Sequence, residues 1–337
     1  MKLSVMLDNI SNQPFSLGCV ADHQFGEGAE ELRAAAAAIR SAGSVVFTGM
    51  GSSMSAAIPA AYYLQSQGFP AEVVETSEWL HFGSGWPRAG AVVLVSRSGE
   101  TIEIVKLLPR LKSISIGVTN VRESLLAREA KHSIFINSEA DRMVAIQTYT
   151  GTMATLLLLA AAVLEEPDDK WREALRGATD SLAKAIDEEQ AQSEDWNEFL
   201  AGAEVVHLLG RGPSLASARE GALLFNEAAR TPSAGLSAAL FRHGPVEIVD
   251  KHFRAIMFAS QAATHDIDLA LASDIESMGG KVRVCQPRDV PSPFEPMIEI
   301  VSPQIASCRL AEAKGIDPGD FRYATLVTTA ETGFEKP

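Results

Sequence analysis

The sequence predicts an α/β protein with two tandem domains, each a parallel sheet flanked by helices in a three-layer sandwich of the Rossmann or flavodoxin type. Two observations predict this fold. Short β-branched runs alternate with alanine- and leucine-rich stretches of helical length, which is typical of parallel strands joined by helices. The plan also occurs twice, since residues 47–57 line up with 208–218 at an offset of 161 residues. The same offset places the strand 92–96 over 253–257, so we expect two copies of one α/β unit.

The strands of the first copy are predicted from runs of β-branched residues. They are expected at 44–48, 72–75, 91–95, 113–118 and 133–136, with helices between them. A helix over 26–40 leads into this sheet, because it carries an alanine run and Gly43 ends it. The acidic stretch 165–198 has few strand signals and connects the copies. We therefore expect a first domain at 1–185, which begins with a helical segment, and a second at 190–337, which ends in a tail.

Composition excludes several classes of function. The chain has 337 residues, 46% apolar and 21% charged, which is enough for two domains of about 150 residues. The net charge of -14 argues against binding of nucleic acid or of an anionic membrane, because either needs a basic surface. The longest apolar stretch, 153–164, is shorter than the about 20 residues of a membrane span. Cys19, Cys285 and Cys308 are far apart and lack metal-ligand spacing. We expect a cytoplasmic protein with no metal, no cofactor, no nucleic-acid partner and no membrane partner.

Two loops rich in glycine and serine are predicted at strand ends. The first, Gly49-Met50-Gly51-Ser52-Ser53, follows a strand and opens a helix, so backbone N–H groups and hydroxyls can bind one anion. As a dinucleotide-binding motif it lacks the third glycine, which is Met54, and Glu72 and Glu75 are poorly placed for a ribose. On its own, this loop is equally well explained as a tight strand-to-helix turn.

The second loop, Ser96-Arg97-Ser98-Gly99-Glu100-Thr101, ends the next inner strand and faces the same edge of the sheet. Ligands of open α/β sheets bind at this carboxyl edge. Hydroxyls and two helix N-termini suit a dianionic phosphate, because its oxygens accept many short hydrogen bonds. The predicted phosphate-binding residues are Gly51, Ser52, Ser53, Ser96, Arg97, Ser98 and Thr101. Turns without a ligand stay open as the alternative.

Several motifs, in order and in spacing, resemble one protein family. They are Asn12-Gln13-Pro14, Gly51-Ser52-Ser53, Thr76-Ser77-Glu78-Trp79, the SRSGET loop at 96–101, Gly210-Arg211-Gly212, Glu220-Gly221-Ala222-Leu223 and Arg242-His243-Gly244-Pro245. Together they cover nearly the whole chain, which is similar to the sugar isomerase (SIS) family in its double form. That family includes the isomerase half of glutamine-dependent glucosamine-6-phosphate synthase, stand-alone amino-sugar-phosphate deaminases and fructosamine deglycases. The resemblance implies two tandem SIS domains and an enzyme that acts on a small sugar phosphate.

The resemblance also implies roles for individual residues. The sugar phosphate is implied to bind Ser52, Ser53, Ser96, Ser98 and Thr101. Glu227 and His243 are implied to act on the sugar, since a carboxylate can move a proton between two carbons and histidine can assist ring opening near neutral pH. Glu220 lies seven residues before Glu227 on one face of a predicted helix, and a catalytic and a structural role are equally expected for it. His243 is implied to reach the neighbouring subunit's site, so we expect a homodimer.

Two departures from the family favour deamination over synthesis. Leucines stand where the synthase pattern has lysines, at Leu224 and, in the tail, at Leu326, and leucine cannot form a Schiff base. A glutaminase half is not expected, so ammonia has no dedicated source. We expect conversion of glucosamine-6-phosphate to fructose-6-phosphate and ammonia. An aldose/ketose phosphosugar isomerase, a fructosamine-6-phosphate deglycase and a non-catalytic sugar-phosphate sensor are the alternatives.

Overall fold

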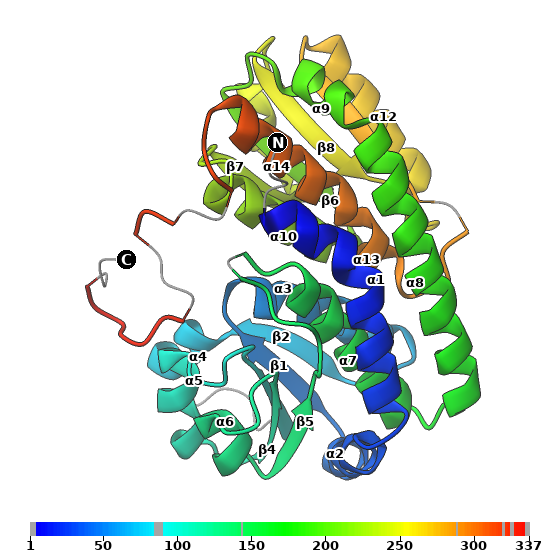
Figure 1. Cartoon of the computed structure of the whole chain (residues 1–337), viewed down its shortest axis with the longest axis vertical. Helices are drawn as coiled ribbons and strands as arrows, with labels where there is room; N and C mark the ends of the chain where they lie inside the picture. Colours follow the sequence, from blue (N-terminus) through cyan, green and yellow to red (C-terminus); the bar gives the residue numbers. More distant parts are fainter. Residues whose placement is uncertain are drawn as a thin grey trace. The chain divides into compact units, whose positions relative to one another are not determined.

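The computed structural model describes residues 5–83, 90–142, 144–287, 289–318, 321–323 and 327–333 (Figure 1). Contacts divide the chain into two compact units. The N-terminal unit comprises Phe15–Asp141, Gln147–Arg176 and Phe321–Pro337. The C-terminal unit comprises Met1–Pro14, Arg142–Ile146 and Gly177–Asp320. The sequence predicted one boundary between 185 and 190, whereas helices α1 (Val5–Gln24) and α8 (Asp168–Ala191) each have residues in both units.

The described residues of the N-terminal unit form a five-stranded parallel sheet with the order β2-β1-β3-β4-β5. Its strands are β1 (Val45–Gly49), β2 (Ala71–Glu75), β3 (Ala91–Val95), β4 (Ile114–Thr119) and β5 (His132–Phe135). Each strand lies within one residue of its predicted position, so the strand prediction is confirmed. β1 and β3 are buried along their whole length, as expected for inner strands covered by helices on both faces.

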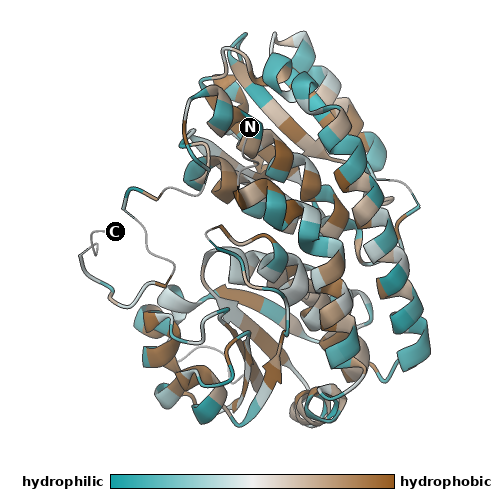
Figure 2. Ribbon diagram, viewed as in Figure 1, coloured by the Kyte–Doolittle hydropathy of each residue, from teal (hydrophilic) through white to brown (hydrophobic). Residues whose placement is uncertain are grey.

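Helices of different character belong to this unit. They are α2 (Ala29–Ala42), α3 (Gly51–Ser66), α4 (Thr76–Phe82), α5 (Ile102–Leu107), α6 (Leu125–Glu129) and α7 (Gln147–Val163). α7 contains the longest apolar stretch of the sequence and is buried on nearly all sides, where it packs against α2 and α3. By contrast, α8 carries many hydrophilic residues (Figure 2). No helix in the described part of the chain is long and apolar enough to cross a membrane.

The described residues of the C-terminal unit form a four-stranded parallel sheet with the order β7-β6-β8-β9. Its strands are β6 (Val205–Gly210), β7 (Ser233–Ser237), β8 (Phe253–Phe258) and β9 (Lys281–Cys285). Its helices include α9 (Ser193–Leu200), α10 (Leu215–Glu227), α11 (Ala238–Phe241), α12 (His265–Ser277), α13 (Glu295–Glu299) and α14 (Val301–Ala313). The buried ring of His207 lies 5.3 Å from that of Phe253 and 5.9 Å from that of Phe241, so a histidine is part of this core.

The two sheets share one plan, and the predicted pair of α/β copies is confirmed. The predicted offset does not hold throughout. With an offset of 161 residues, Thr48 of β1 corresponds to Leu209 of β6. In the sheets, Thr48 pairs with Leu94 of β3, and Leu209 pairs with Met257 of β8. Strands β3 and β8 are therefore offset by 163 residues. The predicted match of 92–96 with 253–257 is therefore wrong by two residues. The connections outside the sheet are longer in the second copy, and insertions there leave the strand pairing intact.

Candidate functional site

The order of the strands brings two loops to one edge of the N-terminal sheet. The chain runs from β1 through α3 to β2 on one side of β1, whereas β3 pairs with the other side of β1. Ligands of open α/β sheets bind outside the carboxyl ends of the strands at such a reversal. The loops at 49–53 and 96–101 follow β1 and β3, so the structure places both predicted phosphate-binding loops at this point.

The loop after β1 is a tight entry into α3. Met50 is extended, and Gly51 begins the helix with a φ of 49°, a left-handed conformation that favours glycine. Ser52 and Ser53 are partly exposed in the first turn of this 16-residue helix, which carries no acidic residue there. The helix N-terminus therefore keeps its partial positive charge at the edge of the sheet, where it favours an anion.

Hydroxyl contacts organise the loop after β3. Ser96 is buried, and its Oγ lies 2.8 Å from Oγ1 of Thr101 and accepts a hydrogen bond from Gly99 N–H at 3.1 Å. Gly99 has a φ of 65°, and a β-carbon added there would lie 2.2 Å from Oγ of Ser124, so only glycine fits. The loop is thus held in a shape in which the hydroxyls of Ser96 and Thr101 converge.

Neighbouring contacts fix the rest of this loop. Ser98 Oγ accepts the N–H of Glu100 at 3.2 Å. The carboxylate of Glu100 accepts the N–H of Leu125 at 2.7 Å, at the start of α6. Asn120 N–H, at the end of β4, donates to the carbonyl of Arg97 at 3.0 Å. The acidic side chain of the loop is therefore bound to α6, and the backbone of the loop is anchored to the next strand.

The predicted proton-transfer carboxylates lie on α10 of the C-terminal unit. Glu220 is buried, whereas Glu227 is the last residue of the helix and is partly exposed. Leu224 between them is fully buried. A lysine at this position would bring its ammonium group into the core at a large desolvation cost, so the leucine matches its surroundings. Of the two carboxylates, Glu227 is the one that solvent can reach.

His243 lies in the turn after α11 and is exposed. Its backbone N–H donates to the carbonyl of Leu240 at 3.0 Å, and Gly244 follows with a φ of 135° before a short 3₁₀ helix (Pro245–Ile248). The side chains of Leu240 and Ile248 are 63% and 47% exposed. An exposed imidazole between exposed apolar side chains is compatible with a subunit interface at this turn.

The predicted site residues thus fall into two groups. One sheet edge of the N-terminal unit holds Gly51, Ser52, Ser53, Ser96, Arg97, Ser98 and Thr101. Glu220, Glu227 and His243 belong to the C-terminal unit, and their roles stay predictions. Leu326 lies outside the described residues. Among the residues that the structure describes, no group of three or more His, Cys, Asp or Glu side chains is arranged to hold a metal ion.

Two buried carboxylates occupy the equivalent edge of the C-terminal unit, and sequence reasoning missed both. Glu299 is 1% exposed and accepts hydrogen bonds from Ser214 Oγ at 2.7 Å and Ser217 Oγ at 2.6 Å. Burial raises the pKa of Glu299, and the serine hydrogen bonds oppose this shift. Asp268 accepts a hydrogen bond from Arg211 Nε at 2.6 Å. Both carboxylates come from helices distant in sequence, so no local pattern marks them.

Comparison with known proteins supports the assignment of the N-terminal sheet. Residues 38–164, which contain β1 to β5 and both loops, match the SIS domain family. This segment is a SIS domain. The predicted resemblance to SIS proteins is thereby confirmed, and the same kind of parallel sheet recurs in the C-terminal unit.

The relatives are distant in sequence, and the solved structures among them are similar in fold. A glutamine–fructose-6-phosphate aminotransferase (isomerizing) from Pyrobaculum aerophilum is 25% identical over 97% of this chain and 57% of its own length. The chain spans about half the length of the curated relatives it matches. A candidate phosphosugar isomerase from Silicibacter pomeroyi has a TM-score of 0.78 and 26% identity over 94% of this chain and 100% of its own. Glucosamine-6-phosphate deaminase from Thermotoga maritima has a TM-score of 0.80 and 21% identity over 96% and 99%.

Proposed function

We propose that this protein is a phosphosugar isomerase and deaminase that converts glucosamine-6-phosphate to fructose-6-phosphate and ammonia. One observation carries the proposal: the hydroxyls of Ser96 and Thr101 converge at one edge of the N-terminal sheet. The order of the strands reverses at this edge, and the N-terminus of α3 lies there too. A phosphate dianion accepts many short hydrogen bonds, and hydroxyl groups with helix N–H groups supply them without a basic surface. This matches a chain whose net charge is -14.

The proposed chemistry needs one base and one group that opens the sugar ring. His243 assists opening of glucosamine-6-phosphate to its aldehyde form. Glu227 takes the proton from C2 and returns a proton to C1, which leaves an imine at C2. Water adds to this imine and ammonia leaves, so fructose-6-phosphate forms without an oxidant or a reductant. Leu224 offers no amine for a Schiff base, which favours water as the nucleophile.

The names of the relatives support this class of reaction. The Pyrobaculum aerophilum relative is named for an isomerizing transfer of an amino group to fructose-6-phosphate, and the Silicibacter pomeroyi structure is named for phosphosugar isomerisation. Both names refer to a sugar phosphate and to its isomerisation. An aldose/ketose phosphosugar isomerase and a fructosamine-6-phosphate deglycase need the same base, so they are the nearest alternatives. A sugar-phosphate sensor would use only the phosphate-binding edge.

An assay with three substrates distinguishes these functions. The purified protein is given glucosamine-6-phosphate, fructosamine-6-phosphate and glucose-6-phosphate, and ammonia and ketose are measured. We expect ammonia and fructose-6-phosphate from the first substrate. Ketose without ammonia would indicate an isomerase, ammonia from fructosamine-6-phosphate alone a deglycase, and binding without turnover a sensor. Glu227→Gln should lower kcat by about 10³-fold with binding retained. Glu276→Gln, which removes an exposed carboxylate from α12 of the same unit, is the control.

We further propose a homodimer in which His243 acts in the partner's site. The exposed turn between Leu240 and Ile248 supports this arrangement. Glu227→Gln and His243→Asn homodimers, each inactive, are mixed and allowed to exchange subunits. If His243 acts across the interface, half of the sites in each heterodimer are intact, and the mixture recovers about a quarter of wild-type activity. No recovery after exchange would contradict the arrangement.

A further inference from the structure

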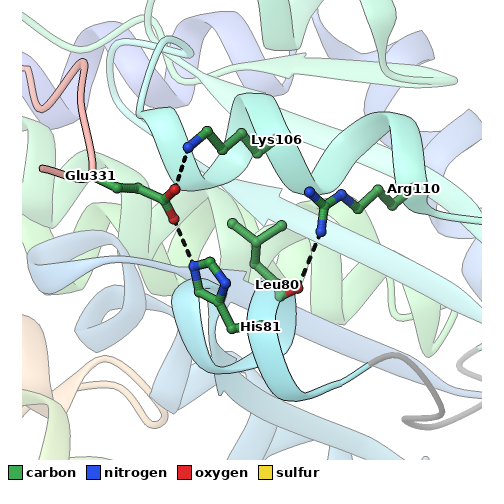
Figure 3. Close-up of polar contacts among 5 residues, drawn as sticks. All are labelled: Leu80, His81, Lys106, Arg110 and Glu331. Carbon is green, nitrogen blue, oxygen red and sulfur yellow. Dashed lines mark hydrogen bonds and ion pairs between the residues drawn. The ribbon is translucent and has the colours of Figure 1, made fainter.

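The segment 327–333 makes contacts that the proposed mechanism does not use. It has no helix or strand, yet it belongs to the N-terminal unit. Ile102 N–H donates to the carbonyl of Thr328 at 3.0 Å. Figure 3 shows the side chain of Glu331 between two basic groups: one carboxylate oxygen lies 2.8 Å from Nε2 of His81, and the other accepts a hydrogen bond from Nζ of Lys106.

Glu331 binds two helices at once. His81 lies in α4 and Lys106 in α5, and the Glu331 side chain is 22% exposed, against 48% and 41% for its partners. Hydrogen bonds from Lys106 and from His81 hold the pKa of Glu331 below its usual value, so the carboxylate is ionised. Arg110, in the short 3₁₀ helix (Leu108–Arg110) that follows α5, donates to the carbonyl of Leu80 in α4 at 3.4 Å and links these neighbouring elements (Figure 3). A single exposed ion pair contributes little, whereas a carboxylate that contacts groups on two helices joins the segment to both of them.

The Thr328 contact reaches the phosphate-binding loop. Ile102 is the first residue of α5 and directly follows Thr101, whose Oγ1 lies 2.8 Å from Oγ of Ser96. The first N–H groups of a helix have no partner within that helix, and the Thr328 carbonyl supplies one for Ile102. The end of the loop is therefore bonded directly to the segment that Glu331 anchors.

We infer that Glu331 is a positioning residue for the phosphate-binding loop. Its contacts with His81 and Lys106 hold the segment 327–333 on α4 and α5, and the Thr328–Ile102 hydrogen bond transmits this restraint to the residue next to Thr101. Because Thr101 and Ser96 must converge to bind one phosphate, loss of the restraint weakens phosphate binding without removing a catalytic group. This inference rests on the proposed function of the loop.

Two variants of Glu331 and one control variant test the inference. Glu331→Gln should raise the hydrogen-exchange rate of the Ile102 amide by about tenfold, because the segment leaves α5 more often. The KM for glucosamine-6-phosphate should rise by about fivefold, with kcat within about twofold of wild type. Glu103→Gln removes a carboxylate from the same helix α5 and should leave both values unchanged. Glu331→Asp, which keeps the charge, should restore part of the protection of Ile102.

Each outcome decides the inference. An unchanged exchange rate at Ile102 in Glu331→Gln would overturn it, and so would faster exchange with an unchanged KM, since the segment would then not position the loop. Calorimetric binding of the sugar phosphate to the wild-type protein separates this inference from the proposed function. If the wild type binds none, the proposed function fails, whereas the exchange comparison still shows whether Glu331 restrains Ile102.

Discussion

The edges of the two sheets use their serine and threonine hydroxyl groups in different ways. In each unit a glycine-containing loop follows the first strand of the sheet along the chain, β1 or β6, and leads to a helix whose first N–H groups favour negative charge. In the N-terminal unit, Ser96 and Thr101 turn their hydroxyls toward each other. In the C-terminal unit, Ser214 donates to the buried carboxylate of Glu299. The serine after β6 thus binds a buried carboxyl group within its own unit, whereas the hydroxyls after β3 are the ones that we propose bind a phosphate from outside.

The largest expected effect is on the internal anions of the C-terminal unit. Asp268→Ala should lower the free energy of unfolding by about 3–5 kcal/mol, because Arg211 would lose the buried carboxylate that accepts its Nε–H. Sugar-phosphate binding should not change, since this edge already holds its own anion. Urea denaturation measures the first value and calorimetry the second, with Asp274→Ala at an exposed position of α12 as the control. Loss of binding in a stable Asp268→Ala protein would break the comparison.

Two serine variants, one from the loop after β3 and one from the loop after β6, give the next largest effect. Ser96→Ala should weaken binding of glucosamine-6-phosphate by roughly 30-fold, or about 2 kcal/mol, because a charge-assisted hydrogen bond is lost. Ser214→Ala should show the opposite pattern: it lowers the free energy of unfolding by about 1–2 kcal/mol and leaves binding unchanged, since its acceptor is Glu299. Equal effects of both variants on binding would show that the two edges do not differ in function.

The protonation of Glu299 sharpens the comparison further. Its folded-state pKa is raised above the ordinary value of 4.5, so its contribution to stability is present below that pH and is lost as pH rises through the folded pKa. Glu299→Gln cannot titrate. Its cost, about 1–2 kcal/mol at about pH 4, should therefore shrink as the pH is raised from there. Denaturant unfolding of both proteins across this range checks it; a cost that grows with pH would contradict the assignment.

The smallest expected effect concerns the cores beneath the edges. At the 161-residue offset, His207 corresponds to Val46. Burial lowers the pKa of His207 below 6.5, so its stabilising effect is present above that pH and is lost as pH falls through the folded pKa. His207→Val should change the free energy of unfolding by less than about 1 kcal/mol at pH 8 and remove this acid sensitivity. The pH dependence of the unfolding midpoint measures it, and identical profiles for both proteins would exclude His207 as its source.

Much of the N-terminal sheet follows from local sequence. Buried parallel strands need continuous β-branched runs, and such runs gave all five strands within one residue. The glycine and serine loops were also found, because left-handed Gly51 and Gly99 leave a visible mark in the sequence. Helix starts were less accurate: α2 begins at Ala29 and not at 26, since residues 25–28 form a turn.

Long-range contacts account for what the sequence did not predict. Glu299 and Asp268 lie 85 and 57 residues from their partners Ser214 and Arg211, so only the folded chain brings them together. The binding of Glu331 to α4 and α5 is equally distant and carries no periodic signal. The roles of Glu227 and His243 rest on family resemblance, because neither residue has a local pattern that identifies its chemistry.

The first residues of the sequence belong to the C-terminal unit and the last described residues to the N-terminal unit, and this affects how the protein can be made. Residues 1–14 belong to the C-terminal unit, whereas 327–333 belong to the N-terminal unit. During synthesis Ile102 therefore acquires its carbonyl partner only after Thr328 has been made. A single cut within α8 would yield two fragments, each lacking a segment that it needs. Expression of either unit alone would require a rearranged gene, and a tag placed after Gly333 would lie close to the segment that Glu331 anchors.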